Sequence, residues 1–490
     1  MLADYFERAA LAASQVLAGF ELKRFRARLE EQPVGLSVGD AALELPEGRH
    51  LADLTVRLLA RLYPAIELRA GTGGDDLAAL ALAINPAIEL VAAGATTGIA
   101  IGDRPQPFPT TVHAGSDGWT GLLSSRPASL GKSRNPLGPG VAACLAAGAL
   151  FRHVFLPHAP EPEARFSAIP DPRDAPNDGW VLDGDAVLVG AGAIGHGALW
   201  ALARAKLDVT LHIVDHESLE LGNLQRYVLA TRADDGAAKA ALAAQALRGP
   251  VRGVPHTCAW DEFVGRHGYR WEHVLLALDS AADRRAVQSS LPGWEANAWT
   301  QPGDLGISCH GRFDGPGACV ACLYLQGEPR PNQDELVATA LGVPQLAAEI
   351  RTLLHSGGPV TEPLLAQIAA GLGLDVTEVL RFSGRPIRSL YVEGICGGAL
   401  IPMGRAGAPA DADLHVPLAH QSVFAGVLLA AQLVRRAMGR TPETTEITRL
   451  DVLGDLAPYP TQPALKAGDG RCLCEDEDFL AAWRAKYAAA

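Results

Sequence analysis

The chain has 490 residues, of which 48% are hydrophobic and 20% are charged, and its formal net charge is −13. This length allows two to four domains, and the apolar fraction is high enough to give each domain a core. A negative charge balance argues against a general binder of nucleic acids or anionic membranes, whose surface should be basic. We therefore expect no nucleic acid and no membrane partner, although a local pocket can still bind a small anion.

The start of the chain and its cysteine content indicate the compartment. Asp4, Glu7 and Arg8 lie where a secretory leader would need an unbroken apolar stretch. The apolar run 416–434 contains a proline and several polar residues, which favours a buried core helix over a membrane span. Eight cysteines in 490 residues are too few for a disulfide scaffold. These features predict a cytoplasmic protein with reduced thiols.

The residues before position 157 show alternating helical and strand patterns. Helices are expected over 51–62, 76–84 and 136–155, and strands over 65–68 and 88–91. These elements predict an α/β domain over residues 1–156. Six prolines between positions 157 and 176 then predict a linker without regular structure over 157–179.

After the linker the alternation becomes sharper. Strands are expected over 186–189, 208–215 and 271–278, and helices over 195–205 and 236–247. This order predicts a doubly wound, Rossmann-like parallel sheet covered on both faces, in a domain that spans 180–490. Residues 328–382 have a purely helical pattern, which predicts an insertion. The similar apolar helices near positions 136 and 416 suggest that the two halves of the chain are distant copies.

A glycine-rich turn follows the strand at 186–189 and opens the next helix. Its glycines are Gly190, Gly192 and Gly195, and the free N–H groups of such a turn favour a bound anion. Asp215 lies 20 residues beyond Gly195, where a carboxylate accepts hydrogen bonds from ribose hydroxyls. At this point a nicotinamide enzyme and an enzyme that binds a nucleoside triphosphate fit equally well.

The charged residues that follow favour the triphosphate. Asn223, Arg226 and Lys239 come shortly after Asp215, and Asp279 ends the strand at 271–278. A reaction at a phosphorus atom of ATP requires cations that stabilise the negative charge of the transition state and a carboxylate that holds magnesium. A nicotinamide enzyme needs neither of these groups. The sequence therefore predicts a site for ATP and Mg²⁺.

This set of residues resembles the adenylation domain of ubiquitin-activating enzymes and of their bacterial relatives ThiF and MoeB. The resemblance covers roughly residues 180–474, apart from the helical insertion. It implies that Asp215 holds the ATP ribose, that Asp279 binds Mg²⁺, and that phosphates are contacted by Asn223, Arg226 and Lys239. The C-terminal carboxylate of a ubiquitin-like protein would then attack the α-phosphorus, giving an acyl-adenylate and pyrophosphate. One departure is Ser280, where many relatives have asparagine after the aspartate.

Two close pairs of cysteines flank the last large block of the sequence. They are Cys319 with Cys322 and Cys472 with Cys474, and four thiolates can hold a tetrahedral zinc. In the resembling family the same two places carry a structural zinc, usually with two residues between the cysteines of each pair. Here the second pair has only one intervening residue. The alternative is that these are two unrelated pairs of reduced thiols.

A further cysteine, Cys396, lies between glycine-rich segments in the interval between the two pairs. In thioester-forming relatives a loop in this interval carries the catalytic cysteine, so Cys396 is the expected acceptor of the acyl group. Cys309, next to His310, is the second choice as a nucleophile. Cys144 and Cys258 are expected to be structural.

The N-terminal domain lacks a glycine-rich fingerprint. Its apolar helix after Asn135 and Pro136 resembles that of the inactive half of two-part ubiquitin-activating enzymes, which packs on the active half as a pseudo-dimer. In those enzymes the inactive half lends an arginine to the ATP site. Arg24, Arg26 and Arg28 are the candidates here.

The sequence thus predicts an enzyme that activates a ubiquitin-like protein. It would adenylate its partner, form a thioester on Cys396 and pass the acyl group to a ubiquitin-conjugating-like enzyme. Related enzymes occur in bacterial operons that serve phage defence, which suggests that role. The alternatives are a sulfur-carrier adenylyltransferase of the thiamine or molybdopterin type, an NAD-dependent oxidoreductase, and a non-catalytic module that kept the fold.

Overall fold

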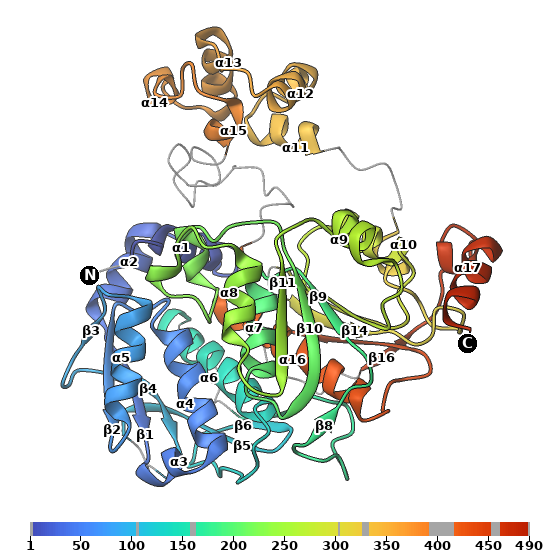
Figure 1. Cartoon of the computed structure of the whole chain (residues 1–490). Coiled ribbons are helices and arrows are strands. Elements are labelled where there is room, and N and C mark those ends of the chain that lie inside the picture. The colour runs from blue at the N-terminus through green and yellow to red at the C-terminus, as the bar shows by residue number, and fades with distance from the viewer. Residues whose placement is uncertain are drawn as a thin grey trace. The chain divides into compact units, whose positions relative to one another are not determined.

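The computed structural model describes residues 3–103, 107–156, 163–301, 304–325, 333–391, 416–451 and 461–488. Two compact units can be distinguished. The larger comprises Met1–Phe6, Ala27–Leu325 and Pro417–Ala490, and the smaller comprises Glu7–Arg26 and Gln326–Val416. The larger unit contains two α/β sheets, and the smaller unit is helical (Figure 1).

The first sheet has the strand order β3-β2-β1-β4-β5-β6-β7. Its strands are β1 (Val34–Val38), β2 (Ala65–Ala70), β3 (Glu89–Leu90), β4 (Thr97–Ile101), β5 (Thr110–Asp117), β6 (Thr120–Ser124) and β7 (Ala164–Ser167). The helices of this part of the chain are α1 (Phe6–Ser14), α2 (Leu22–Glu31), α3 (Asp40–Glu44), α4 (Pro46–Leu59), α5 (Gly74–Ile84) and α6 (Leu137–Phe155). β3 to β5 are parallel, whereas β6 and β7 are antiparallel to their neighbours.

The second sheet has the order β11-β10-β9-β12-β13-β14-β15-β16, and β8 pairs with β10. Its strands are β8 (Trp180–Val181), β9 (Ala186–Val189), β10 (Leu207–Val214), β11 (Val251–His256), β12 (His273–Leu276), β13 (Glu295–Gln301), β14 (Asp304–Cys309), β15 (Thr445–Leu450) and β16 (Gln462–Ala464). The accompanying helices are α7 (Ala193–Leu202), α8 (Lys239–Ala246), α9 (Trp260–His267), α10 (Ala281–Ser289), α16 (Ala419–Ala437) and α17 (Glu477–Tyr487).

The two sheets share one topology. From β1 to β7 and from β9 to β15 the strands follow the same spatial order and change from parallel to antiparallel pairing at the same step. The long apolar helices α6 and α16 occupy the same place, each between the last two strands of this pattern. The structure therefore confirms the predicted doubly wound fold and the expectation that the two halves share an architecture.

The two halves of the larger unit pack against each other through α6 and α16. Within the first half α4 contacts α6, and within the second half α7 contacts α16. A Cβ at Gly140 of α6 would lie 2.9 Å from the Trp200 ring of α7, so the two halves approach closely there. By length and composition α6 could also cross a membrane. Since 94% of its apolar segment is buried within the protein, α6 is a core helix.

The prediction of a linker without regular structure is wrong for part of residues 157–179. β7 lies within this segment and completes the first sheet, with Ala164 paired to Leu123 of β6. The reason is the spacing of the prolines, because none falls between positions 163 and 169. The first half of the molecule thus extends beyond residue 156.

The predicted helical insertion is present in the smaller unit. Its helices are α11 (Gln333–Ala340), α12 (Ala347–Ser356), α13 (Glu362–Leu372), α14 (Val376–Leu380) and α15 (Ile387–Ser389). They enclose their own apolar cluster, which includes Ile350, Leu365 and Phe382. The helical region ends at Ser389 rather than at residue 382, and residues 328–332 lie outside the described part.

We expect the free energy of unfolding to fall as the pH is lowered from 7.5 to 5. His196 of α7 and His420 of α16 are buried, and burial lowers the pKa of each imidazole to about 3. An unfolded histidine titrates near pH 6.5, so below that value the unfolded chain binds more protons than the folded chain. Each residue can then cost about 1.4 kcal/mol per pH unit.

Urea unfolding at several pH values measures this slope. The variant with both His196→Gln and His420→Gln should have a shallower pH dependence than the wild type. An equal slope in the two proteins would contradict the assignment.

Candidate active site

The glycine turn links β9 to α7 at the carboxyl end of the sheet. Gly190 has φ +95, and a Cβ there would lie 2.6 Å from the Ala277 carbonyl oxygen. A Cβ at Gly195 would lie 2.4 Å from the carbonyl oxygen of Gly190. Larger residues are therefore excluded, and the amides at the start of α7 remain available for an anion.

Asp215 follows β10 and lies against the glycine turn. Its Oδ2 accepts a hydrogen bond of 2.8 Å from the Ala191 amide, and its Oδ1 accepts one of 2.9 Å from the Glu217 amide. Each carboxylate oxygen keeps a further lone pair for a hydroxyl donor. The role of Asp215 in holding a ribose stays a prediction.

Lys239 begins α8 and is only 5% exposed. Its Nζ lies 2.5 Å from Glu217 Oε2 and 5.3 Å from the centre of the Tyr227 ring. Burial alone would lower the pKa of this ammonium, but Tyr227 and Glu217 together raise it above its ordinary value. Lys239 is therefore a charged group next to the site, and a phosphate would share it with Glu217.

Asn223 and Arg226 lie in and just after the 3-10 helix η1 (Leu221–Gln225). The Asn223 Oδ1 accepts a hydrogen bond of 3.1 Å from the Glu220 amide, which closes the start of this helix. The guanidinium carbon of Arg226 lies 5.7 Å from the centre of the Tyr227 ring. Asn223 therefore has a structural hydrogen bond, in addition to the phosphate contact predicted from sequence.

Asp279 is exposed three residues after the end of β12, the strand that neighbours β9. A backbone hydrogen bond of 2.9 Å, from the Ala277 amide to the Val189 carbonyl oxygen, joins the segment that carries Asp279 to the end of β9. Ser280 caps α10 by accepting a hydrogen bond of 3.0 Å from the Asp283 amide. Arg284 is buried and donates a hydrogen bond to the Leu278 carbonyl oxygen, which holds the backbone next to Asp279.

The predicted ATP-site residues thus lie in the segments that follow the carboxyl ends of β9, β10 and β12 in the second sheet. Sequence reasoning missed Tyr227, whose hydroxyl lies near Gly192 and whose ring lies near Lys239 and Arg226. It also missed Arg57 and Arg61 of the first half, which reach the segment after Arg226. The Nε of Arg28 donates a hydrogen bond of 3.0 Å to the Val154 carbonyl oxygen within the first half, and its role at the ATP site stays a prediction. Arg24 and Arg26 belong to the smaller unit, and their role stays a prediction.

The two cysteine pairs meet in the structure. The sulfurs of Cys319, Cys322, Cys472 and Cys474 all lie within 4.8 Å of one another. The separations include 3.5 Å between Cys319 and Cys472 and 3.4 Å between Cys322 and Cys474. A tetrahedral zinc with bonds of about 2.3 Å needs sulfurs about 3.8 Å apart, so the cluster fits this metal. The single residue between Cys472 and Cys474 does not prevent convergence.

We expect the protein purified from zinc-supplemented cells to hold one zinc ion per chain. Cys474→Ser should lose most of it, because three remaining thiolates leave the tetrahedral site incomplete. Inductively coupled plasma mass spectrometry measures the stoichiometry. Cys258→Ser is the matched control, since Cys258 lies outside the cluster and should leave zinc content unchanged. A wild type without zinc would contradict the prediction.

The nucleophile candidates differ in their surroundings. Cys396 lies outside the described residues, so its role stays a prediction. Cys309, the second choice, is buried in β14, and burial raises the pKa of its thiol to about 12. A thiol of that pKa supplies almost no thiolate at neutral pH, so Cys309 is not a suitable nucleophile.

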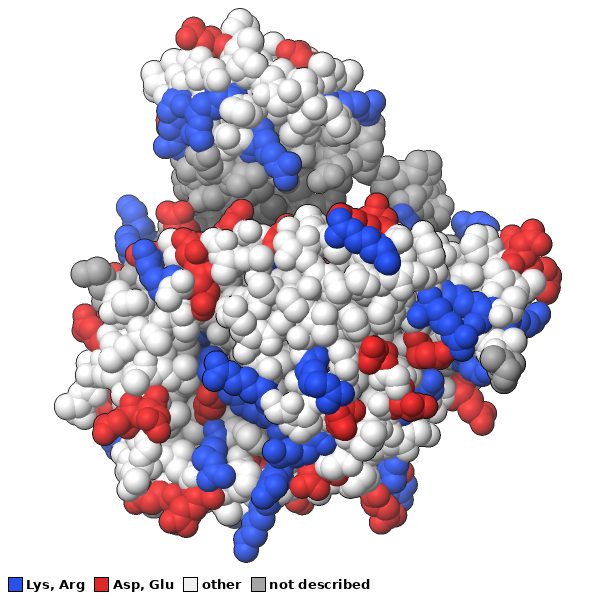
Figure 2. Space-filling model, viewed as in Figure 1, with Lys and Arg blue, Asp and Glu red and all other residues white. Residues whose placement is uncertain are grey.

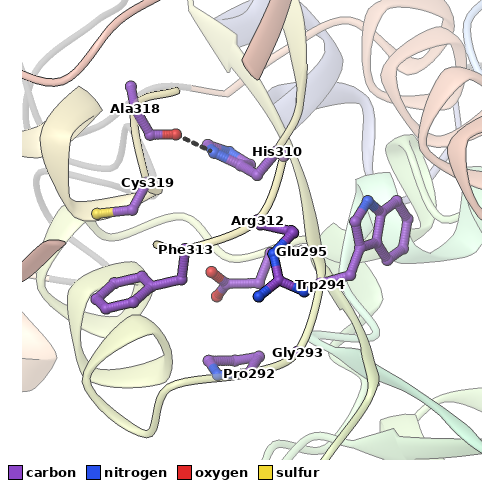
Figure 3. Close-up of a pocket in the computed structure, with 10 residues that line it drawn as sticks. Pro292, Gly293, Trp294, Glu295, His310, Arg312, Phe313, Ala318 and Cys319 are labelled. Carbon is purple, nitrogen blue, oxygen red and sulfur yellow. Dashed lines mark hydrogen bonds between the residues drawn. The ribbon is translucent and has the colours of Figure 1, made fainter. Parts of the chain in front are cut away.

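A small pocket lies beside the cysteine cluster (Figure 3). Glu295 and His310 line it together with Cys319, and His310 Nδ1 lies 2.9 Å from the Ala318 carbonyl oxygen. Burial raises the pKa of Glu295 to about 8, so this carboxyl is largely neutral at pH 7. None of the residues of the glycine turn lines this pocket, which is therefore distinct from the predicted ATP site.

Acidic and basic side chains lie among one another across the described part of the face shown in Figure 2. A mixed surface of this kind gives no strong long-range attraction for a polyanion. Phosphate recognition would therefore depend on the local groups around the glycine turn.

The sheet order and the turn between β9 and α7 define a Rossmann-like nucleotide-binding protein. A family model described as the ThiF family matches residues 181–453, more than half of the chain. The chain therefore belongs to the ThiF family of adenylating enzymes, and membership of this family implies the use of ATP and Mg²⁺. A second model, described as Prokaryotic E2 family C, matches residues 38–156.

Similar proteins were found among curated sequences and solved structures. The protein y4jF of Sinorhizobium fredii is 40% identical over 507 residues, covering 99% of this chain and 97% of that protein. The Nedd8-activating enzyme E1 catalytic subunit of Drosophila melanogaster is 33% identical over 108 residues, covering 21% of this chain and 24% of that protein. The crystal structure of E. coli MccB with MccA-N7isoASN shares 12% identity over 60% of this chain and 67% of its own, with a TM-score of 0.36.

Proposed function

We propose that this enzyme activates a ubiquitin-like protein and passes it to a ubiquitin-conjugating-like enzyme. The observation that carries the proposal is the grouping of Asp215, Lys239 and Asp279 around the glycine turn. The match of a short segment to a Nedd8-activating enzyme supports the choice of a ubiquitin-like substrate. A role in a bacterial defence pathway and a cytoplasmic location are part of the same proposal.

In the first step the C-terminal carboxylate of the ubiquitin-like protein attacks the α-phosphorus of ATP, and pyrophosphate leaves. The amides of the glycine turn, Arg226 and Lys239 bind the phosphates, and Asp215 orients the ribose. Asp279 would hold Mg²⁺, which neutralises phosphate charge when bound. In the second step the thiolate of Cys396 attacks the acyl carbon, a thioester forms and AMP leaves.

The first half of the molecule is proposed to be a degenerate, inactive copy of the adenylation domain. It shares the strand order of the second half, but α3 follows β1 directly after Gly39, where the second half has its glycine-rich turn. This arrangement leaves no comparable cradle for phosphates there. Residues 1–156 would then complete the active half from across the interface.

The match to Prokaryotic E2 family C raises a second candidate role, in which the first half itself accepts the acyl group. Cys144 is the only cysteine in residues 1–156. It is fully buried in α6, and burial raises the pKa of its thiol well above the ordinary value. An acceptor needs an accessible thiolate. A separate conjugating enzyme is therefore the better partner.

A non-reducing gel tests the proposed function. Purified chain, ATP, Mg²⁺ and a ubiquitin-like protein from the same genome are mixed, and the wild type is compared with Cys396→Ala and Cys309→Ser. A thiol-sensitive adduct in the wild type and in Cys309→Ser, but not in Cys396→Ala, supports the thioester step. AMP release without an adduct in any protein would instead indicate a sulfur-carrier adenylyltransferase.

A further inference from the structure

Two buried arginines of the first half hold the backbone of the second half just beyond Arg226. Arg61 follows α4 and is only 2% exposed. Its Nη2 donates hydrogen bonds of 2.6 Å to the carbonyl oxygens of Tyr227 and Ala230. One turn earlier, Arg57 donates a bond of 2.9 Å to the Val228 carbonyl oxygen. Guanidinium groups thus bind most of the carbonyls of segment 227–230.

The same segment carries a side chain that reaches the glycine turn. Tyr227 is 4% exposed, and a Cβ placed on Gly192 would lie 3.4 Å from its Oη. The Lys239 Nζ lies 5.3 Å from the centre of the Tyr227 ring, and the Arg226 guanidinium carbon lies 5.7 Å from it. The ring also lies 4.6 Å from the ring of His196. Tyr227 therefore lies close both to the glycine turn and to the two cations.

We propose that Tyr227, held by Arg61, is a positioning residue that sets the two cations against the phosphate-binding turn. This inference rests on the proposed binding of ATP at that turn. A phenol ring is rigid, and the faces of its ring attract cations, so it can fix Lys239 and Arg226 relative to Gly192. The first half thereby acts on the nucleotide site through a backbone clamp formed by Arg57 and Arg61.

The chemistry of the clamp explains why an arginine is required. The planar guanidinium presents several donors in a fixed fork, so a single Nη2 group of Arg61 can serve two carbonyls while Nη1 donates to the Arg57 carbonyl at 2.8 Å. A lysine keeps the charge but not the fork. Glutamine removes the charge and shortens the reach, which leaves buried carbonyls without donors.

The test is the Kd of ATP–Mg²⁺ for the full chain, measured by isothermal titration calorimetry without any acyl substrate. We expect Arg61→Gln to raise the Kd about tenfold and Arg61→Lys to restore part of the affinity. Tyr227→Leu removes the ring and should raise the Kd about fivefold, whereas Tyr227→Phe keeps the ring and should stay close to the wild type. The ATP–pyrophosphate exchange reaction should show a raised KM for ATP with kcat changed less than threefold. When the Arg61 and Tyr227 substitutions are combined, the Kd should rise by less than the product of the two single fold-changes, because both residues act through one contact.

Arg204→Gln is the matched control. Arg204 is also a largely buried arginine at the contact of the two halves, where it donates to Asp53, but no hydrogen bond joins it to segment 227–230. It should lower the melting temperature while leaving the ATP Kd unchanged. Equal Kd values for wild type, Arg61→Gln and Tyr227→Leu would overturn the positioning role. A wild type that binds no ATP would instead refute the proposed function itself.

Discussion

Asp279→Asn is expected to lower the rate of ATP–pyrophosphate exchange by about 100- to 1000-fold, the loss typical of one electrostatic group at a reacting centre. Asp279 is exposed beside the glycine turn, and its carboxylate is the proposed ligand of Mg²⁺. An asparagine keeps the shape but supplies a neutral oxygen, which holds a hard dication poorly. The exchange rate at saturating ATP measures the effect.

Two comparisons separate this loss from damage to the fold. Asp283→Asn changes an exposed aspartate four residues away on α10 and should keep exchange within threefold of the wild type. The melting temperature of Asp279→Asn should be unchanged, because the replaced side chain is exposed. Raising the Mg²⁺ concentration should restore part of the activity. Exchange near the wild-type rate in Asp279→Asn would contradict the assignment.

The second half of the fold could be predicted from sequence because its signals are local. The glycine turn, the apolar strand before it and the charged residues after it each follow from a short stretch of residues. The expected strand at 186–189 agrees with β9, and the expected helix at 195–205 overlaps α7. Parallel pairing then brings the strand ends together, so Asp215 and the glycine turn had to meet.

The first half was harder to predict because its signals are weaker. β1 is a run of only five buried residues, and Gly39 alone follows it where the second half has several glycines. β7 lies between two groups of prolines, and the prolines led to the prediction of a linker in place of this short strand. The similar apolar helices near positions 136 and 416 suggested a duplication, and the shared strand order of the two sheets supports it.

The contact between the halves could not have been predicted from local patterns. Arg57 and Arg61 are one helical turn apart, and such a pair normally indicates a solvated face. In the folded chain their partners lie more than 160 residues away in sequence. Tyr227 gave no signal either, because an isolated tyrosine is usually a core residue. Only the three-dimensional arrangement shows that its hydroxyl lies near Gly192 and its ring near Lys239 and Arg226.

Asp53→Ala is expected to lower the free energy of unfolding by about 3 kcal/mol at pH 7. The Asp53 Oδ2 accepts hydrogen bonds of 2.7 Å from Trp200 Nε1 and from Arg204 Nη2, and of 3.0 Å from Arg57 Nε. The side chains of Asp53, Arg57 and Arg204 are each only 14–22% exposed to solvent. Removing the carboxylate leaves two largely buried guanidinium groups without their counter-charge.

The sign of the pH dependence follows from the same contacts. Burial raises the pKa of Asp53, but Arg204 and Arg57 outweigh it and hold the pKa below 3.8. The stabilisation is therefore fully present above about pH 4 and is lost as the pH falls through the lowered pKa. The stability difference between wild type and Asp53→Ala should stay constant from pH 7 to 5 and shrink only at lower pH.

Urea unfolding measures both effects, with Asp208→Ala as the matched control. Asp208 also pairs with an arginine, Arg252, at 2.9 Å, but both side chains are about 60% exposed, so its loss should cost less than about 1 kcal/mol. A cost for Asp53→Ala as small as that of the control would show that the pair does not join the halves. A large cost would show that the ion-pair cluster of Asp53, Arg57 and Arg204 stabilises the contact between the two halves.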